Sequence, residues 1–497
     1  MSLSRRHFFF GSLLAGAVPK GGFGSTASLR SLGYKSPNEK LNIASIGSGG
    51  KAASDIRGCA PTENIVALCD VDDKQAAETF KQFDKAPKYK DFRKMLEKED
   101  KNIDACIVTI PDFMHATAAM AAMQLGKHVY VQKPLVRTIW EARMMNDAAA
   151  KYKVATQMGN QGYSNEGTRQ CAEMIWNGDI GNVTEVHAWT DRPIWPQGLM
   201  EIPAETPVPE TLDWDLWLGS AQARPYTSGG EAYAKSRYQF YQPFNWRGFY
   251  DFGCGALGDM ACHILGAPNL ALKLGAPTSV ECVMKEGTSS FMFPKKSIIR
   301  FDFPARGSMP PVKLFWHDGL KDPPKIDGVP EGEMLGDIRR ARTQGQQGAP
   351  ARPAFTGYVG EVYDASATYQ QGENDGSIFI GDKGIITTGT YGANTRLLPV
   401  EKMKDYRFPP ALLTRSPEGS NSHYRDWIRA AKGGDPACSN FSVSAPFVEW
   451  MLLGVIALRT EGKIEWDPAK MKITNNADAN KYLKPVYRKG WAPAWKA

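Results

Sequence analysis

Short runs of β-branched and apolar residues alternate with longer helical stretches between residues 40 and 155, and this alternation restricts the fold more than any other feature. The expected strands are residues 41–46, 64–69, 103–110 and 128–131, and the expected helices are residues 52–59, 74–83, 115–125 and 139–152. Repeated strand–helix–strand units form right-handed crossovers, which build a parallel sheet with helices on both faces. The sequence therefore predicts an α/β fold that begins with a doubly wound parallel sheet.

The pattern changes after residue 155. Irregular stretches rich in Trp and Pro now separate strands expected at residues 183–189, 278–283, 296–303, 312–316, 377–380 and 463–466. Strands that follow one another without alternating helices favour antiparallel pairing. We therefore expect an α+β domain with a large, mostly antiparallel open sheet, against which helices at residues 421–431 and 445–460 pack back toward the first domain.

A chain of 497 residues suits two domains. We assign residues 40–155 to the first domain and residues 156–497 to the second. Residues 331–374 are rich in Gly, Gln, Arg and Pro and only weakly periodic, which predicts an insertion or lid within the second domain.

Composition excludes several classes of protein. Apolar residues make up 42% and charged residues 23% of the chain, and we find no run near the 20 or so apolar residues of a membrane span, so stable membrane insertion is not expected. A net charge of +7 without a clustered basic face does not indicate nucleic-acid binding. The eight cysteines are scattered, with no Cys-x-x-Cys pair or Cys/His cluster, so no metal site is predicted.

The first 30 residues have the pattern of a leader. Ser4-Arg5-Arg6-His7-Phe8-Phe9 precedes an apolar run at residues 10–18 and small residues near 25–27, as in a twin-arginine export signal. We therefore exclude residues 1–30 from the fold and expect a periplasmic or other extracytoplasmic location. The twin-arginine route carries folded proteins, so a cofactor can be bound before export.

A glycine-rich turn follows the first strand and opens the first helix. Gly47-Ser48-Gly49-Gly50-Lys51-Ala52 matches Gly-x-Gly-x-x-Gly/Ala, in which backbone N–H groups approach a pyrophosphate at a helix N-terminus. Asp70 ends the second strand about 20 residues later, where a carboxylate accepts hydrogen bonds from the adenosine ribose and repels a 2′-phosphate. These features predict a Rossmann domain that binds NAD in preference to NADP. Capping of the next helix is the alternative role of Asp70.

Further motifs resemble one family. Tyr130-Val131-Gln132-Lys133-Pro134 is similar to the Glu-Lys-Pro signature of the Gfo/Idh/MocA oxidoreductases (glucose–fructose oxidoreductase and inositol dehydrogenase), and Thr-x-Pro-x-x-x-His at residues 109–115 and Gly-Ala-Leu-Gly-Asp-Met-Ala-Cys-His at residues 255–263 support the resemblance. It extends from about residue 40 to the C-terminus and is greatest for the exported branch. It implies a nicotinamide-dependent oxidoreductase whose cofactor contacts include Pro111, Asp112, His115, Gln132, Lys133 and Asn160.

The resemblance also implies a catalytic set. Oxidation of a carbinol needs a general base within hydrogen-bond reach of the hydroxyl. Asp259 and His263 are four residues apart and share a helix face, although such a pair is more often a surface pair. The family pattern makes His263 the acid/base, with Asp259 orienting it or contacting a neighbouring hydroxyl, and Lys133 stabilising alkoxide charge. Gln132 departs from the usual Glu and brings no charge beside Lys133.

The expected substrate is a sugar, a cyclitol or a derivative. Arg192 and Arg247 are candidates for contacts with hydroxyls or an acidic group, and Trp195 for packing on a sugar face. Two other functions remain open: an NAD-dependent glycosidase that works by transient oxidation and elimination, and a cofactor-binding sensor or scaffold without turnover. Because an exported protein meets no nicotinamide pool, we expect a tightly bound cofactor, and the family resemblance implies a homo-oligomer.

Overall fold

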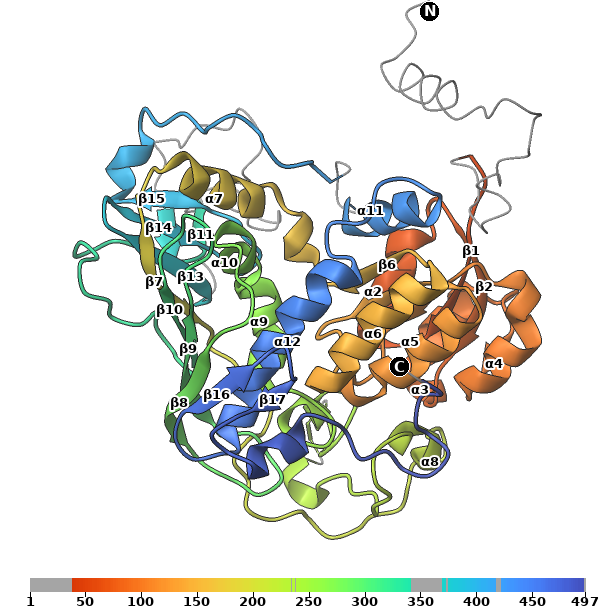
Figure 1. Cartoon of the computed structure of the whole chain (residues 1–497). Helices are drawn as coiled ribbons and strands as arrows, with labels where there is room; N and C mark the ends of the chain where they lie inside the picture. Colours follow the sequence, from red (N-terminus) through yellow and green to blue (C-terminus); the bar gives the residue numbers. More distant parts are fainter. Residues whose placement is uncertain are drawn as a thin grey trace, which may run out of the picture.

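The computed structural model contains two large sheets side by side, with the helix α12 (Phe441–Leu458) between them (Figure 1). It describes residues 38–495 except 234, 237, 341–368, 372–373 and 417–421. The proposed leader at residues 1–30 and most of the proposed lid at residues 331–374 lie outside the described residues. The parts of residues 331–374 that are described include two short strands, β11 (Ile338–Arg340) and β12 (Tyr369–Gln371), which pair antiparallel.

The N-terminal sheet has six parallel strands in the order β3-β2-β1-β4-β5-β6. Its strands are β1 (Asn42–Ile46), β2 (Asn64–Cys69), β3 (Lys88–Tyr89), β4 (Ala105–Val108), β5 (His128–Gln132) and β6 (Thr156–Gly159). Its connecting helices are α2 (Gly50–Cys59), α3 (Asp73–Gln82), α4 (Phe92–Glu99), α5 (His115–Gln124) and α6 (Ile139–Tyr152). The order reverses between β1 and β4, which is the switch point where doubly wound sheets bind nucleotides.

Helices cover both faces of this sheet, as predicted. Apolar residues of α4, α5 and α6 fill one side, and residues of α2 and α3 fill the other. The second side is completed by α11 (Ser422–Ala431), whose Tyr424, Trp427 and Ile428 join the same apolar cluster. A helix from the far end of the chain therefore becomes part of the first domain's core.

The second sheet has nine strands in the order β15-β14-β13-β7-β10-β9-β8-β16-β17. Its strands are β7 (Val183–Trp189), β8 (Ser279–Glu286), β9 (Lys296–Phe303), β10 (Val312–Asp318), β13 (Gly376–Gly381), β14 (Ile385–Thr388), β15 (Arg396–Leu398), β16 (Ile464–Asp467) and β17 (Lys472–Ile473). Among the described strands, β7 and β10 are parallel and the remaining neighbours are antiparallel. The prediction of a mostly antiparallel second sheet is confirmed.

Four helices of the second half lie on one face of this sheet: α7 (Glu166–Asn177), α9 (Gly255–Ile264), α10 (Gly266–Ala271) and α12. The short helix α8 (Trp214–Leu218) instead packs against the first domain, where its Trp217 ring contacts Phe113. Within the described ranges, α12 is the one helix long and apolar enough to cross a membrane by length and composition, although the sequence predicted no such segment. In the fold, 72% of this helix is buried. It contacts α6, α9, β8 and β9, so its apolar surface forms the interface between the two domains.

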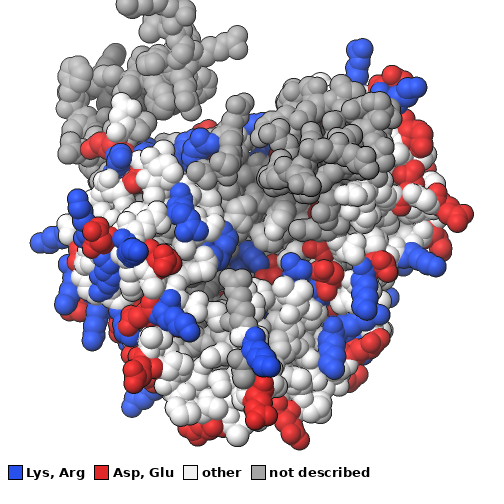
Figure 2. Space-filling model, turned by 180° about the vertical axis from the view of Figure 1, so that it is seen from behind, with Lys and Arg blue, Asp and Glu red and all other residues white. Residues whose placement is uncertain are grey.

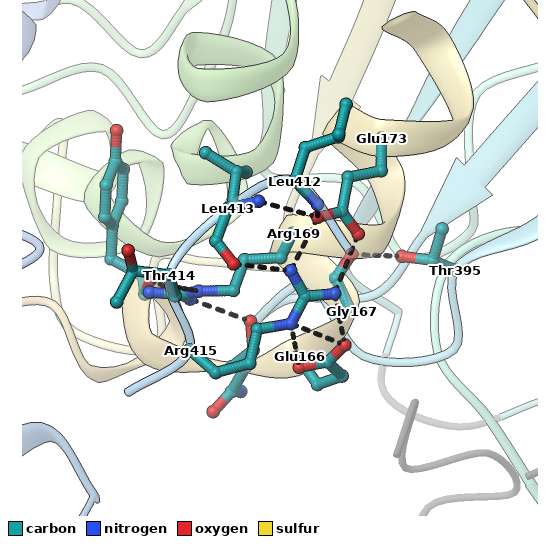
Figure 3. Close-up of polar contacts among 11 residues, drawn as sticks. Glu166, Gly167, Arg169, Glu173, Thr395, Leu412, Leu413, Thr414 and Arg415 are labelled. Carbon is teal, nitrogen blue, oxygen red and sulfur yellow. Dashed lines mark hydrogen bonds and ion pairs between the residues drawn. The ribbon is translucent and has the colours of Figure 1, made fainter. Parts of the chain in front are cut away.

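An arginine holds the chain segment after β15 against α7. Arg415 forms ion pairs with Glu166 (2.7 Å) and Glu173 (2.5 Å), both on α7, as Figure 3 shows. The Glu173 carboxylate also accepts hydrogen bonds from the backbone N–H groups of Leu412 and Leu413. Because Glu173 is only 1% exposed, its charge depends on these partners.

Candidate active site

The glycine-rich turn links β1 to α2. Gly47 has a φ of +94°, and a Cβ there would lie 2.1 Å from the Thr109 carbonyl oxygen, so only glycine fits. Asp70 follows β2 and accepts hydrogen bonds from the backbone N–H groups of Ser48 (2.8 Å) and Gly49 (3.1 Å), although burial raises the pKa of this carboxyl. The Asp70 side chain therefore connects the end of β2 to the glycine-rich turn at the predicted nucleotide site.

A cavity of about 660 Å³ extends from this turn into the space between the domains. Its walls contain many of the sequence-predicted site residues, namely Gly47, Gly49, Gly50, Asp70, Pro111, Asp112, Gln132, Lys133, Arg192, Arg247, Asp259 and His263. Aromatic side chains, including Tyr238, Phe244, Trp246 and Tyr391, line the part formed by the second domain. One continuous cavity thus joins the nucleotide turn to the proposed catalytic groups.

Lys133 and Asp259 meet across the domain interface. The Lys133 ammonium donates to Asp259 Oδ1 (2.8 Å) and to the Asp259 carbonyl oxygen (2.6 Å). Arg247, in the 3₁₀ helix η6 (Asn245–Gly248), also donates to Asp259 Oδ1, at 2.9 Å. Burial alone would raise the pKa of Asp259, but Lys133 and Arg247 hold it well below its usual range. Asp259 is therefore a carboxylate shared by two cations.

His263 lies one helical turn after Asp259 on α9. No hydrogen bond joins these two side chains in the described structure, so the contact by which Asp259 would orient His263 is not present. The His263 ring instead packs edge-on against Tyr391, with 4.8 Å between ring centroids. Its Nδ1 is buried without a partner among the described residues. Burial and the nearby Lys133 lower the pKa of His263 well below its usual value, so the imidazole is neutral and able to accept a proton.

Asp112 brings a further carboxyl to the same cavity. It begins the 3₁₀ helix η3 (Asp112–Met114) and is 5% exposed. Burial raises its pKa to about 7, although Arg247 and Lys133 oppose the shift. In this part of the cavity Asp259 stays ionised, whereas Asp112 titrates near neutrality.

Four predicted site residues lie outside the cavity lining. Both ring nitrogens of His115 face backbone carbonyls, Pro134 at 2.8 Å and Ile110 at 2.7 Å. The Asn160 amide donates to the Cys262 carbonyl oxygen and accepts from Ser439. The other two also have internal partners: the Ser48 hydroxyl donates to a backbone carbonyl, and the Trp195 indole donates to Gln197. These side chains support the walls of the cavity.

Sequence reasoning missed Lys51, Asp55 and Tyr391. Lys51 and Tyr391 line the cavity, and the buried carboxylate of Asp55 bonds to Lys51 and Gln132. The i, i+4 spacing of Lys51 and Asp55 was a usable signal, but it is also typical of a surface ion pair. No local pattern marks Tyr391, which the β14–β15 connection brings to His263.

The residues present fit a dinucleotide. The Gly47–Gly50 turn leaves the start of α2 open to a pyrophosphate, and Asp70 lies beside the turn.

Among the described residues, no group of three or more His, Cys, Asp and Glu side chains is arranged to hold a metal ion. Figure 2 shows basic and acidic side chains mixed over one face of the molecule.

The fold and the cavity define a two-domain protein, in which a doubly wound parallel-sheet domain meets a second domain built on a mixed sheet. The Gfo/Idh/MocA model described as an oxidoreductase family with an NAD-binding Rossmann fold matches residues 41–160. The model of that family's C-terminal alpha/beta domain matches residues 180–284. Residues 41–160 and 180–284 are therefore similar to the two domain models of the Gfo/Idh/MocA oxidoreductase family, which together match a little less than half of the chain.

Named relatives are similar over shorter stretches. A glycosyl hydrolase family 109 protein of Solibacter usitatus is 31% identical over 157 residues, which are 28% of this chain and 35% of that protein. An inositol 2-dehydrogenase of Salmonella paratyphi B is 29% identical over 125 residues, 25% of this chain and 37% of the other. The chain thus matches little more than a third of the length of each.

Solved structures extend the likeness in fold to most of the chain. The WlbA dehydrogenase of Bordetella pertussis, solved with NADH and UDP-GlcNAcA, has a TM-score of 0.54 and 14% identity. The superposition covers 86% of this chain and 99% of that protein. At this identity the likeness establishes the fold.

Proposed function

We propose that this protein is an NAD-dependent oxidoreductase that transfers hydride between the nicotinamide and a hydroxyl-bearing carbon of a sugar, a cyclitol or a derivative. One observation carries the proposal: Lys133, at the end of β5 in the nucleotide domain, is bonded to Asp259 on α9, and His263 lines the same cavity. A proton acceptor, His263, and a cation, Lys133, therefore line the same cavity as the nucleotide turn.

The nicotinamide, when bound, supplies the hydride acceptor or donor. His263 is the proposed acid/base, because its neutral ring accepts the hydroxyl proton as the carbon is oxidised. Lys133 stabilises the negative charge that develops on that oxygen. Asp259 holds the Lys133 ammonium and the Arg247 guanidinium in place, and this role replaces its predicted contact with His263.

The choice of NAD rests on Asp70. Its carboxylate lies at the end of β2 beside the nucleotide turn, where it favours ribose hydroxyls and disfavours a 2′-phosphate. The turn, Pro111, Asp112, Gln132 and Lys133 form the rest of the proposed cofactor wall.

The aromatic wall supports a sugar-like substrate. Phe244 and Trp246 each pack against the Arg247 guanidinium, with centroid distances of 4.4 and 4.3 Å, and their rings line the cavity. Aromatic faces suit the apolar side of a sugar ring, and nearby cations suit its hydroxyls or an acidic substituent. A sugar-like substrate also agrees with the names of two similar proteins, the Salmonella inositol 2-dehydrogenase and the Bordetella WlbA dehydrogenase, which was solved with UDP-GlcNAcA.

Purified protein provides the test. The protein is prepared without added nucleotide, its bound nucleotide is identified by mass spectrometry, and sugars, cyclitols and aryl glycosides are then added while the absorbance of reduced nicotinamide is followed. Reduction of bound nucleotide by a free polyol is the expected result. Absence of any nucleotide, together with no response when NAD is added, would instead favour the sensor or scaffold.

The glycosidase is the second candidate, favoured by the name of the Solibacter relative. In that reaction, transient oxidation acidifies a neighbouring C–H bond and permits elimination of the glycosidic group. Release of aglycone from an aryl glycoside without net nicotinamide reduction would identify it. Lasting reduction by a free polyol would identify the dehydrogenase.

We also propose export by the twin-arginine route, a tightly retained cofactor and a homo-oligomer. Arg5→Lys with Arg6→Lys should keep the protein in the cytoplasm, as cell fractionation would show. Dialysis should leave the nucleotide bound, and light scattering should give more than one chain per particle. Loss of nucleotide on dialysis, or a monomeric mass, would exclude the corresponding property.

A further inference from the structure

Asp55 is a buried carboxylate on α2 whose side chain is 0% exposed. Its Oδ1 lies 2.5 Å from the Lys51 ammonium and accepts from the Tyr424 hydroxyl at 2.8 Å. Its Oδ2 accepts from the Thr109 hydroxyl at 2.8 Å and from the Gln132 amide at 2.9 Å. Donors from α2, β5, α11 and the residue that follows β4 therefore meet at one carboxylate, and each of its oxygens has two donors.

Two of these donors, Lys51 and Gln132, line the cavity that contains the proposed cofactor wall. Lys51 directly follows the nucleotide turn, and Gln132 directly precedes Lys133. Asp55 thus joins the start of α2 to the end of β5. Tyr424 extends the network to α11 and fixes this helix against α2.

The pairing sets the orientation of the Gln132 amide. Because Nε2 donates to Asp55, Oε1 faces the Lys133 backbone N–H, at 3.3 Å. A Cβ on Gly159 would lie 2.6 Å from Gln132 Nε2, so β6 packs closely against the same amide. A glutamate at this position would set a second buried carboxylate against Asp55 and would bring no donor for it.

We propose that Asp55 is a positioning residue matched to Gln132, and that together they fix Lys51 and the Gln132–Lys133 strand end around the dinucleotide. This pairing explains why residue 132 is a glutamine, whereas the family resemblance predicts a glutamate there. Asp55 on α2 already supplies the buried negative charge, and Gln132 on β5 supplies a neutral donor to it. The role toward the dinucleotide rests on the proposed function, whereas the pairing itself does not.

Exchange of the carboxylate and amide groups between the two positions tests the pairing. Gln132→Glu, Asp55→Asn and the double variant are compared with wild type in the full-length protein. The readouts are the thermal midpoint without nucleotide and the NADH dissociation constant from nicotinamide fluorescence. Gln82→Glu, at an exposed position of α3, controls for the added charge.

Gln132→Glu should lower the thermal midpoint by about 5 °C and weaken NADH binding roughly tenfold, since two buried carboxylates then face each other. The double variant should recover most of both losses, because the introduced asparagine amide on α2 donates to the introduced glutamate carboxylate on β5 in a reversed pair. If Gln132→Glu yields no folded protein, recovery of folded double variant supports the same conclusion.

A Gln132→Glu variant as stable and as tight for NADH as wild type would overturn the proposal. So would a double variant no better than Gln132→Glu, whether measured by midpoint or by yield of folded protein. If wild-type protein fails to bind NADH, the cofactor assignment fails, while the thermal comparison still decides whether Asp55 and Gln132 are matched.

Discussion

Lys133 Nζ lies 2.8 Å from Asp259 Oδ1 although 126 residues separate them in the chain. One residue belongs to the nucleotide-binding domain and the other to α9 of the second domain. The contact closes the domain interface at the proposed reaction centre, so domain packing and catalytic geometry depend on the same ion pair.

Replacement of Lys133 by Met should reduce turnover of the identified substrate by about 10²- to 10³-fold, because the developing oxyanion loses its cation. NADH binding should change far less. Steady-state kinetics and NADH titration measure the two effects. Lys90→Met is the matched control, since Lys90 lines the cavity but pairs with Asp73. A Lys133→Met enzyme within fivefold of wild type would remove Lys133 from the catalytic set.

Asp112→Asn should stabilise the protein at alkaline pH. The folded pKa of Asp112 is about 7, against 3.8 for the free side chain. The folded state therefore holds this proton over pH 4–7 while the unfolded state has released it, so Asp112 makes stability fall as pH rises through this window.

Across the whole window, the loss in the free energy of unfolding caused by Asp112 is at most about 4 kcal/mol. Denaturant unfolding of both proteins at pH 5 and pH 8 measures it, and the gain from Asp112→Asn should be larger at pH 8. Asp84→Asn, at an exposed position, is the control. An equal gain at both pH values would contradict the assignment.

The rate of alcohol oxidation should not fall near pH 6.5 as pH is lowered. Burial lowers the pKa of His263 well below that value, so its ring stays neutral and able to accept the proton. The profile of kcat/KM is best measured in the Asp112→Asn variant, which removes a cavity carboxyl whose pKa is raised to about 7. His263→Ala should abolish turnover and retain the cofactor. An inflection at pH 6–7 in Asp112→Asn would show that His263 is not buried during catalysis.

Asp70→Ser should narrow the preference for NADH over NADPH, since the carboxylate that repels a 2′-phosphate is removed. Asp70 also binds the backbone of the nucleotide turn, so NADH affinity should fall as well. Parallel titrations with NADH and NADPH give both constants. An unchanged affinity ratio would mean that Asp70 acts only on the turn.

Arg415→Met should lower the free energy of unfolding by about 3 kcal/mol, because the Glu173 charge is left buried without its cation. Denaturant unfolding measures the loss, and NADH affinity should stay constant because Arg415 does not line the cavity. Adding Glu173→Gln should recover part of the stability. If the double variant is less stable than Arg415→Met, the buried charge is not the cause.

Local sequence was sufficient for most of the first domain's longer strands and helices. Hydrophobic periodicity and the glycine-rich turn act over a few residues, and β1, α2, β2, α5, β5 and α6 lie within two residues of their predicted bounds. The helix α4 was missed. The strand β3 was missed as well, because two residues give almost no periodic signal. α12 begins at Phe441, before the predicted 445, because Asn440 caps it and Pro446 is accommodated inside.

Tertiary structure decided how distant side chains meet. The motifs placed Lys133, Asp259 and His263 on the candidate list, but packing joins Asp259 to Lys133 and Arg247 and leaves His263 against Tyr391. Likewise, Gln132 was visible as a departure from a motif, whereas its partner Asp55 was not. Periodicity reports which face of an element is buried; the partner that satisfies a buried polar group is chosen only when separate elements pack together.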